Sequence, residues 1–271
     1  MKLRGALRLD VASFSCDGGR DYNEDAVAEC EAFGAIRLLM LADGAGGQGG
    51  GDVAAKTALD AARAEFFRMP AFSNDTLRRC IQRADQAVRA KQTSEARLSR
   101  MASTFVALLA DYRRGEVLLG NLGDSRCYVF RGDRVMAQSY DHSLVQRFVD
   151  AGLYPVEKLR QHPKRNVLYA SLGANDEAVP PCLSESPVQL QPGDGALLCS
   201  DGVWELLEDA LLGQMHSNSA TVQVWRDQLI AAVHSRMPVG HDNFSAILMR
   251  CLRWEGIEGD DDLRTVQPMA C

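Results

Sequence analysis

The sequence lacks several patterns that would assign it to common protein classes. It has no run of about 18 apolar residues, so no transmembrane helix is expected. The basic residues near the N-terminus are not followed by the apolar stretch of a signal peptide. Lysine and arginine number 30 against 36 for aspartate and glutamate, so the chain lacks the basic surplus of a nucleic-acid binder. We therefore expect a protein that binds neither membranes nor nucleic acids.

Several signatures of phosphate chemistry are also missing. No cysteine is followed six residues later by arginine, which excludes the loop of the cysteine phosphatases. The Asp-x-Asp-x-(Thr/Val) motif of aspartyl-phosphate enzymes and the Gly-Asp-x-His-Gly motif of other metallophosphatases do not occur. The P-loop pattern Gly-x-x-x-x-Gly-Lys-(Ser/Thr) is absent as well. Any phosphate chemistry in this chain must use another arrangement.

The eight cysteines are dispersed and form no Cys-x-x-Cys pair. Cys127, Cys199 and Cys251 lie within apolar runs and are expected to be small buried residues. This distribution is typical of a reducing compartment, so we expect a cytoplasmic protein.

What the sequence does contain is a series of short strands interrupted by pairs of helices. Helices are predicted over 52–67, 74–93, 209–216 and 220–236, and another is expected to begin near Ser143. Strands rich in β-branched or aromatic residues and bounded by turn residues are predicted over 9–15, 36–42, 104–111, 116–122, 126–131, 134–139, 167–171, 188–190, 195–200 and 244–252. Because four strands follow one another in mid-chain, we predict an α+β fold, an α-β-β-α sandwich of two packed antiparallel sheets flanked by helices.

Five aspartates share one setting, since each lies in a turn-like motif and most adjoin an apolar run that is predicted to be a strand. Carboxylates at strand ends are expected to converge, and they repel one another unless cations neutralise them. Oxygen ligands without a His or Cys pattern favour Mn²⁺ or Mg²⁺ over Zn²⁺. The pattern predicts a multi-metal site of the kind that usually performs phosphoryl chemistry. The residues are Asp25, Asp43, Asp124, Asp201 and Asp242.

A glycine-rich segment follows Asp43 and offers a competing interpretation. Gly44, Gly46 and Gly49 match the Gly-x-Gly-x-x-Gly pattern of dinucleotide-binding proteins, after a strand and before a helix. However, Asp43 would lie beside the pyrophosphate, and the first helix is followed by a second helix instead of the required strand. We therefore interpret the glycines as a turn that leaves room for metals and phosphate and frees the Gly44 carbonyl as a ligand.

Arg20 lies five residues before Asp25. Its planar guanidinium suits a phosphate, although an isolated pair of this kind is most often a surface ion pair.

The order of these motifs resembles that of the metal-dependent protein phosphatase family, also called type 2C. The glycine-rich sequence after Asp43 is similar to that of its bacterial members. The resemblance covers about residues 8–252. The matching segments are 19–25, 42–47, 101–104, 121–126, 141–143, 162–166, 199–204 and 240–243.

This resemblance implies a cleft with two principal Mn²⁺ or Mg²⁺ ions and a weaker third ion. It implies that Asp43 bridges the principal ions, with the Gly44 carbonyl on one of them and Asp201 and Asp242 on the other. It further implies that Glu24 and Asp25 bind the second ion directly or through water, and that Asp124 joins Asp201 at the third. By the same resemblance Arg20 holds the substrate phosphate and residues 152–166 form a flap.

The implied reaction is hydrolysis of phosphoserine and phosphothreonine in proteins, by water activated between two ions and without a covalent phosphoenzyme. Residues 1–254 are then the catalytic domain, and 255–271 an acidic, flexible tail. The expected partners of this monomer are phosphoproteins that a eukaryotic-like Ser/Thr kinase modifies. Two alternatives remain open: a catalytically silent phosphoprotein-binding module on the same fold, and a nicotinamide-dependent oxidoreductase.

The chain departs from the family pattern at two places. Ala45 stands where a Met or His usually follows the Asp-Gly pair, so the general acid proposed for eukaryotic members has no counterpart here. The usual Gly-Thr-Thr is Ala102-Ser103-Thr104, a change that we expect to be structural.

Overall fold

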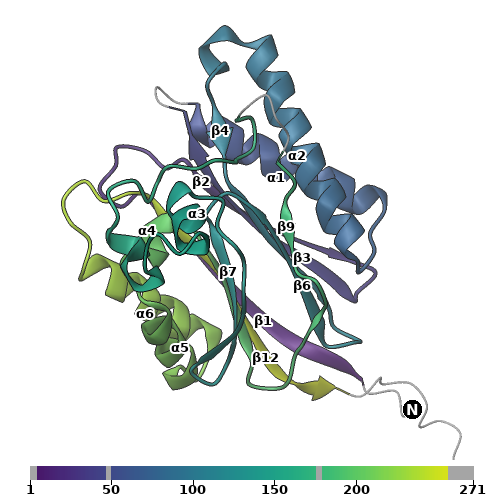
Figure 1. Ribbon diagram of the computed structural model, residues 1–271. Helices are drawn as coiled ribbons and strands as arrows, with labels where there is room; N and C mark the ends of the chain where they lie inside the picture. Colours follow the sequence, from purple (N-terminus) through teal and green to yellow (C-terminus); the bar gives the residue numbers. More distant parts are fainter. Residues whose placement is uncertain (1–4, 47–49, 175–178, 256–271) are drawn as a thin grey trace, which may run out of the picture.

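The computed structural model describes residues 5–46, 50–174 and 179–255. Two antiparallel sheets pack face to face, with one pair of long helices on the outside of each sheet (Figure 1). This arrangement confirms the predicted α-β-β-α sandwich. Among the helices in the described ranges, none combines the length and hydrophobicity needed to cross a bilayer.

The two sheets draw their strands from distant parts of the chain. The first sheet has the order β1 (Ala6–Cys16), β12 (Phe244–Glu255), β11 (Gly195–Cys199), β7 (Arg126–Arg131) and β8 (Arg134–Gln138). The second has the order β10 (Val188–Gln189), β6 (Glu116–Leu122), β5 (Phe105–Asp111), β3 (Ile36–Ala45) and β2 (Asp25–Ala32). The short strands β4 (Ala102–Ser103) and β9 (Cys182–Leu183) pair with β3 and β6.

The long helices match their predicted ranges within two residues at each end. The helices are α1 (Gly51–Arg68), α2 (Asn74–Ser94), α3 (Leu144–Asp150), α4 (Asp201–Trp204), α5 (Asp209–Asn218) and α6 (Val222–His234), with 3₁₀ turns η1 (Ala96–Leu98) and η2 (Val156–Gln161). Ser73 and Thr221 accept hydrogen bonds from backbone N–H groups in the first turns of α2 and α6, which satisfies donors that would otherwise lack partners.

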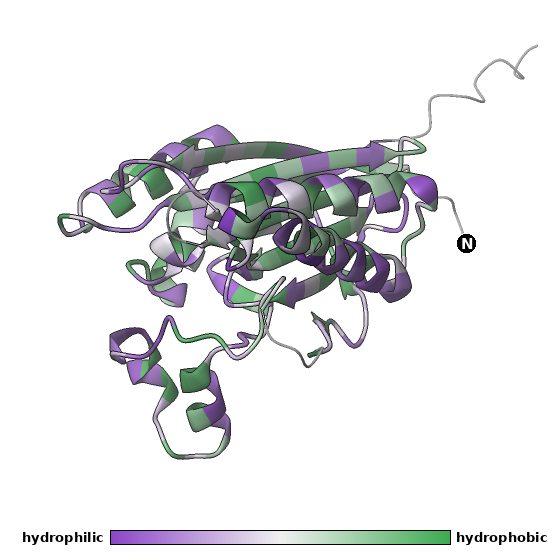
Figure 2. Cartoon of the chain, turned by 90° about the horizontal axis from the view of Figure 1, so that it is seen from above, coloured by the Kyte–Doolittle hydropathy of each residue, from purple (hydrophilic) through white to green (hydrophobic). Residues whose placement is uncertain are grey.

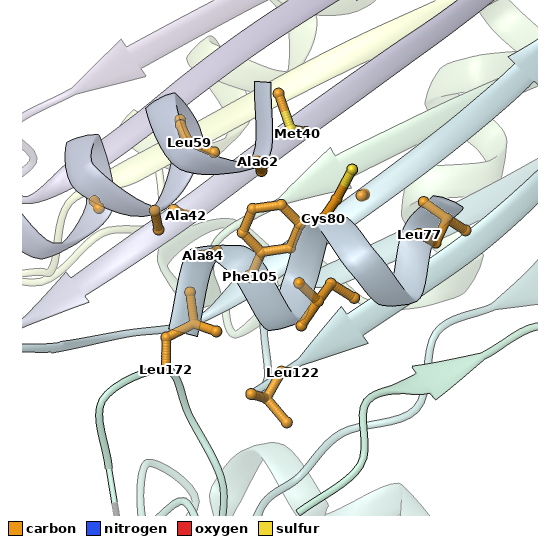
Figure 3. Close-up of a cluster of buried hydrophobic side chains, with 14 of the residues drawn as sticks. Met40, Ala42, Leu59, Ala62, Leu77, Cys80, Ala84, Phe105, Leu122 and Leu172 are labelled. Carbon is orange, nitrogen blue, oxygen red and sulfur yellow. The ribbon is translucent and has the colours of Figure 1, made fainter. Parts of the chain in front are cut away.

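Strand β3 is buried on both faces, which explains its continuous apolar sequence. Because side chains alternate along a strand, Leu38 and Met40 contact the core beneath α1 and α2, while Leu39 and Leu41 face the other sheet. Figure 3 shows Phe105 of β5 among side chains of α1 and α2 in the first of these cores. In Figure 2 hydrophobic residues gather in the strands, and the helices show hydrophilic stripes.

One strand prediction was wrong, and strands β2, β4 and β9 were not predicted. Residues 167–171 form no strand, because this segment pairs only through one isolated bridge, between Leu168 and Ser143. Strand β2 was not predicted because its Ala and Glu residues have low β propensity, yet pairing with β3 holds it at the sheet edge. Of the tail predicted from residue 255, Glu255 ends β12 and forms an ion pair with Arg8, and the rest lies outside the described residues.

Candidate metal and phosphate site

A pocket of about 360 Å³ opens at one end of the sandwich, where strands of both sheets end. Asp43 and Gly44 lie at the end of β3, and Asp124 follows β6 of the same sheet. Asp201 begins α4 directly after β11, and Asp242 precedes β12 in the other sheet. The pocket lining includes Arg20, Glu24, Asp43, Gly44, Asp124, Asp201 and Asp242. The structure therefore brings these predicted site residues to one place.

Asp25 lies directly opposite Asp43 in the β2–β3 ladder, beside the pocket. Its carboxylate is buried, and the Ser200 hydroxyl donates a hydrogen bond of 2.7 Å to Oδ2. The other oxygen, Oδ1, has no hydrogen-bond partner within the described structure. A buried carboxylate oxygen without a partner is costly, and a cation would satisfy it.

The backbone of Asp43 is held on both sides. Its N–H donates to the Thr104 hydroxyl at 3.0 Å, and its carbonyl accepts from the Thr104 N–H at 2.8 Å and from the Ser103 hydroxyl at 3.0 Å. Thr104 in turn shares a 2.7 Å hydrogen bond with Ser125. The Ala102-Ser103-Thr104 variant therefore keeps two hydroxyls that fix the Asp43 backbone.

Glu24 is fixed by the start of α1. The Gly51 N–H, in the first turn of that helix, donates to Glu24 Oε1 at 3.0 Å, where the helix dipole favours negative charge. A side chain on Gly51 would collide with this carboxylate, so the glycine is required for the contact. The Glu24 N–H donates to Asn243 Oδ1 at 2.9 Å.

Asn243 is a supporting residue to which the sequence analysis gave no role. Besides the bond to Glu24, its Nδ2 donates to the carbonyls of Asp17 and Tyr22 at 2.8 and 3.0 Å. It therefore ties the loop that carries Arg20 and Glu24 to the start of β12. The signals in the sequence were its position directly after Asp242 and its place in the family-matching segment 240–243.

Asp124 is linked through Trp204 to the buried ion pair of Arg126 and Asp141. The Trp204 indole N–H donates to the Asp124 carbonyl at 2.9 Å, and the Arg126 guanidinium lies 3.7 Å from the centre of the Trp204 ring. Arg126 in turn makes a two-pronged contact with Asp141, with a closest distance of 2.6 Å. Both side chains of this pair are at most 5% exposed.

The carboxylates of the pocket oppose one another electrostatically. Burial, followed by the charges of neighbouring carboxylates, raises the pKa values of Asp43 and Asp201 well above the ordinary range. Burial and the Asp141 charge raise the pKa of Asp124 to about 7, and burial raises the pKa of Asp25 to about 6. The Arg20 guanidinium contacts the Asp242 carboxylate at 2.7 Å. A site with this excess of negative charge attracts cations.

The donor set fits hard divalent ions. Every predicted ligand offers oxygen, and the buried Oδ1 of Asp25 lacks a partner. In the described ranges no three His, Cys, Asp or Glu side chains are already positioned together to hold one metal ion. The carboxylates instead line a shared pocket large enough for ions and a phosphate.

We expect the protein without metal to lose stability as the pH rises from about 4 to about 7. A carboxyl group whose pKa is raised by folding keeps its proton in the folded state after the unfolded chain has released it, so its stabilisation is lost as pH passes the folded pKa. The raised pKa values of Asp25 and Asp124, about 6 and about 7, set the upper end of the pH range over which this stability is lost. In chelator the melting temperature should fall by at least about 3 °C between pH 5.5 and 7.5, given roughly 2–4 °C per kcal/mol for chains of this size.

Saturating Mn²⁺ provides the control, because cations that neutralise the carboxylates should widen the gap between melting temperatures with and without metal as pH rises. A melting temperature in chelator that increases over this range would contradict the prediction.

Comparison with known proteins places this geometry in a family. A family model described as Protein phosphatase 2C matches residues 18–233. The serine/threonine phosphatase stp of Listeria innocua is 29% identical over 245 residues, which cover 88% of this chain and 94% of that protein.

Solved structures agree with this assignment. Stp1 from Staphylococcus aureus superposes with a TM-score of 0.81 at 26% identity, covering 92% of this chain and 98% of that one. The catalytic domain of PstP, described in complex with two manganese ions, gives a TM-score of 0.74 at 27% identity and covers 90% and 98% of the two chains. The chain belongs to the protein phosphatase 2C family.

Proposed function

We propose that this protein hydrolyses phosphoserine and phosphothreonine in other proteins, in a reaction that depends on Mn²⁺ or Mg²⁺. The observation that carries the proposal is the single pocket in which carboxylates from both sheets face Arg20. Membership of the phosphatase family supports the reaction, and the two manganese ions of the PstP catalytic domain support the metal dependence.

The proposed ligands of the ions follow the family resemblance, and their places in or beside the pocket support the assignment. Asp43 would hold both ions, because it lies at the centre of the carboxylates that raise its pKa. The Gly44 carbonyl, Asp201 and Asp242 would complete the shells from the two sheets. Glu24 and Asp25 would bind directly or through water. Asp124, next to Asp201, would hold a weaker third ion.

When bound, the ions would supply Lewis acidity that brings the pKa of water toward neutrality and balances the charge of the phosphate. The chain's own residues do the positioning. Ser103 and Thr104 use their hydroxyls to fix Asp43, so these groups support the site and do not attack phosphorus. Arg20 is half exposed and contacts Asp242. In the reaction it would release Asp242 and bind two phosphate oxygens at once through its planar guanidinium.

The cysteines bear on the cellular setting. The cysteines in the described ranges are free thiols, which suits a reducing, cytoplasmic compartment: Cys16, Cys30, Cys80, Cys127, Cys182, Cys199 and Cys251. We further propose a monomer that acts on the products of a eukaryotic-like Ser/Thr kinase. A catalytically silent phosphoprotein-binding module is disfavoured because it would need neither the full set of carboxylates nor the unpartnered Asp25 oxygen.

The Arg20→Ala variant tests the phosphate-binding role. A charge-assisted hydrogen bond is worth about 1.5–3 kcal/mol, so kcat/KM for a phosphothreonine peptide should fall roughly 10- to 100-fold, largely through KM. Phosphate release should be measured with Mn²⁺ and with EDTA. Arg63→Ala is the matched control, because Arg63 forms an exposed pair with Asp60 on α1. Unchanged kcat/KM in Arg20→Ala would remove the phosphate-binding role, and wild-type turnover that ignores EDTA would overturn the metal-dependent reaction.

A further inference from the structure

A second pocket of about 310 Å³ adjoins the catalytic pocket. It lies between α2 and the segment 166–174, and Ser171 lines both pockets. Leu168 faces the catalytic pocket and Ala170 the second pocket, so this segment is the wall between them. We refer to residues 166–174 as the dividing segment.

The dividing segment is irregular but firmly anchored. The backbones of Leu172 and Ser103 exchange hydrogen bonds of 2.7 and 3.1 Å, and Ser103 belongs to β4, which pairs with β3 at Gly44. The Leu172 side chain is fully buried in the core under α2 (Figure 3). The wall of the second pocket is thus fixed to the strand that carries the proposed metal ligands.

Helix α2 anchors the same segment from the other side. The Gly173 N–H donates to Asp85 Oδ1 at 2.8 Å, and Gln92 donates to the Gly173 carbonyl at 2.9 Å. A side chain on Gly173 would crowd Val88 and Gln92, and its φ of +74° suits glycine. These contacts fix the dividing segment against α2 on the side of the second pocket.

The chemistry of the second pocket differs from that of the catalytic one. Its floor is apolar and includes the buried side chains of Ile81 and Leu122, with Val179 half-buried beside them. At its edge Arg89 is paired with Asp85 at 2.8 Å. Arg78 is more exposed, and its nearest carboxylate, on Asp75, is 3.7 Å away. The pocket therefore suits an apolar side chain accompanied by an acidic group.

We propose that the second pocket binds the substrate protein, by taking an apolar side chain close in sequence to the phosphorylated residue while Arg78 pairs with an acidic neighbour. The proposal rests on the proposed phosphatase function and adds a substrate preference to it. An extended peptide advances about 3.3 Å per residue, so it would cross a single chain segment within about three residues. A phosphate in the catalytic pocket and a side chain in the second pocket can thus belong to one short peptide.

The test compares phosphothreonine peptides with a small ester, p-nitrophenyl phosphate, in the presence of Mn²⁺. The peptides carry a Leu-Glu pair placed in turn at each position within about four residues of the phosphothreonine, on an alanine background. At one preferred position we expect kcat/KM to exceed that of the all-alanine peptide about tenfold, which corresponds to about 1.4 kcal/mol.

Two variants act on the pocket and one serves as control. Gln82→Trp should fill the cavity from the exposed face of α2, and Arg78→Glu should repel the acidic residue. Each should raise KM for the preferred peptide about tenfold, because binding is lost equally in the ground and transition states, and leave p-nitrophenyl phosphate unchanged. Arg83→Glu makes the same charge change on α2 outside this pocket and should alter neither substrate.

Turnover of the small ester with no positional preference among the peptides would overturn the second-pocket proposal alone. An equal effect of the two pocket variants on both substrates would also overturn it, because the pocket would then support the catalytic site. No Mn²⁺-dependent turnover of either substrate by the wild type would instead overturn the phosphatase function itself.

Discussion

The Asp43→Asn variant should lose phosphatase activity by about a hundred- to a thousandfold, the scale seen when a central electrostatic contact to the transition state is removed. Asp43 lies at the centre of the carboxylates and faces the pocket from the end of β3. An amide can offer only one neutral oxygen and cannot neutralise two cations. Phosphate release at saturating Mn²⁺ measures the loss.

The same variant should be more stable than the wild type when metal is removed. Burial and the charges of Asp25 and Asp201 raise the pKa of Asp43, so the ionised group opposes folding at neutral pH. Asparagine removes that repulsion and retains the shape. Thermal unfolding in EDTA at pH 7.5 should therefore give a higher melting temperature for Asp43→Asn than for the wild type, although the activity of the variant is lower.

Asp124→Asn is the matched control for this pair of measurements. If Asp124 serves only the weaker third ion, its loss should reduce activity less than about tenfold, or about 1.4 kcal/mol. Asp43→Asn protein that is folded and retains more than a tenth of wild-type turnover would show that the proposed bridging role is wrong.

The Asp141→Asn variant should lower the free energy of unfolding by about 3–5 kcal/mol, the usual cost of removing one partner of a buried ion pair. Arg126 would be left charged, with its side chain 5% exposed, against Trp204 and the Tyr128 hydroxyl. Because Trp204 donates to the Asp124 carbonyl, the disturbance should also reach the edge of the metal site.

Urea unfolding of the metal-free protein gives the free energy directly. Asp60→Asn, which removes an exposed partner of Arg63, should change it by less than about 0.5 kcal/mol and serves as the control. A loss below about 1 kcal/mol for Asp141→Asn would mean that water or a neighbouring group already compensates Arg126.

The sequence predicted the outline of the fold and the cluster of carboxylates for a physical reason. Apolar runs such as the one before Asp43 end where the chain leaves the core, and the charged residue that follows must lie at a strand end. In α6, Trp225, Leu229 and Val233 recur at a helical period in the sequence, and the structure buries all three. Local sequence pattern was sufficient to predict an element where one feature dominated the segment, such as a continuous apolar run or a helical period of apolar residues.

Contacts that depend on distant parts of the chain could not be predicted in this way. The hydrogen bonds of Asn243 to Glu24 and Tyr22 join segments separated by about 220 residues, and nothing in the neighbouring sequence indicates them. The segment 167–171 has strand-like residues, but its backbone hydrogen bonds go to the Lys164 and His142 carbonyls and the Leu144 N–H instead of to a ladder. Strand β2 shows the reverse case, in which pairing overrides weak propensity.

The pairing of β1 with β12 has a consequence for synthesis of the protein in the cell. Among the described strands, β1 pairs within its sheet with β12 alone, and the paired residues Cys16 and Phe244 are more than 200 positions apart. At a translation rate of about 5–20 residues per second, the partner strand β12 is synthesised on the order of tens of seconds after β1. An unpaired strand edge invites association with other chains, so the nascent chain is expected to need chaperone protection. Since Asp242 directly precedes this strand, no phosphatase activity should exist until the ribosome has synthesised the chain through β12.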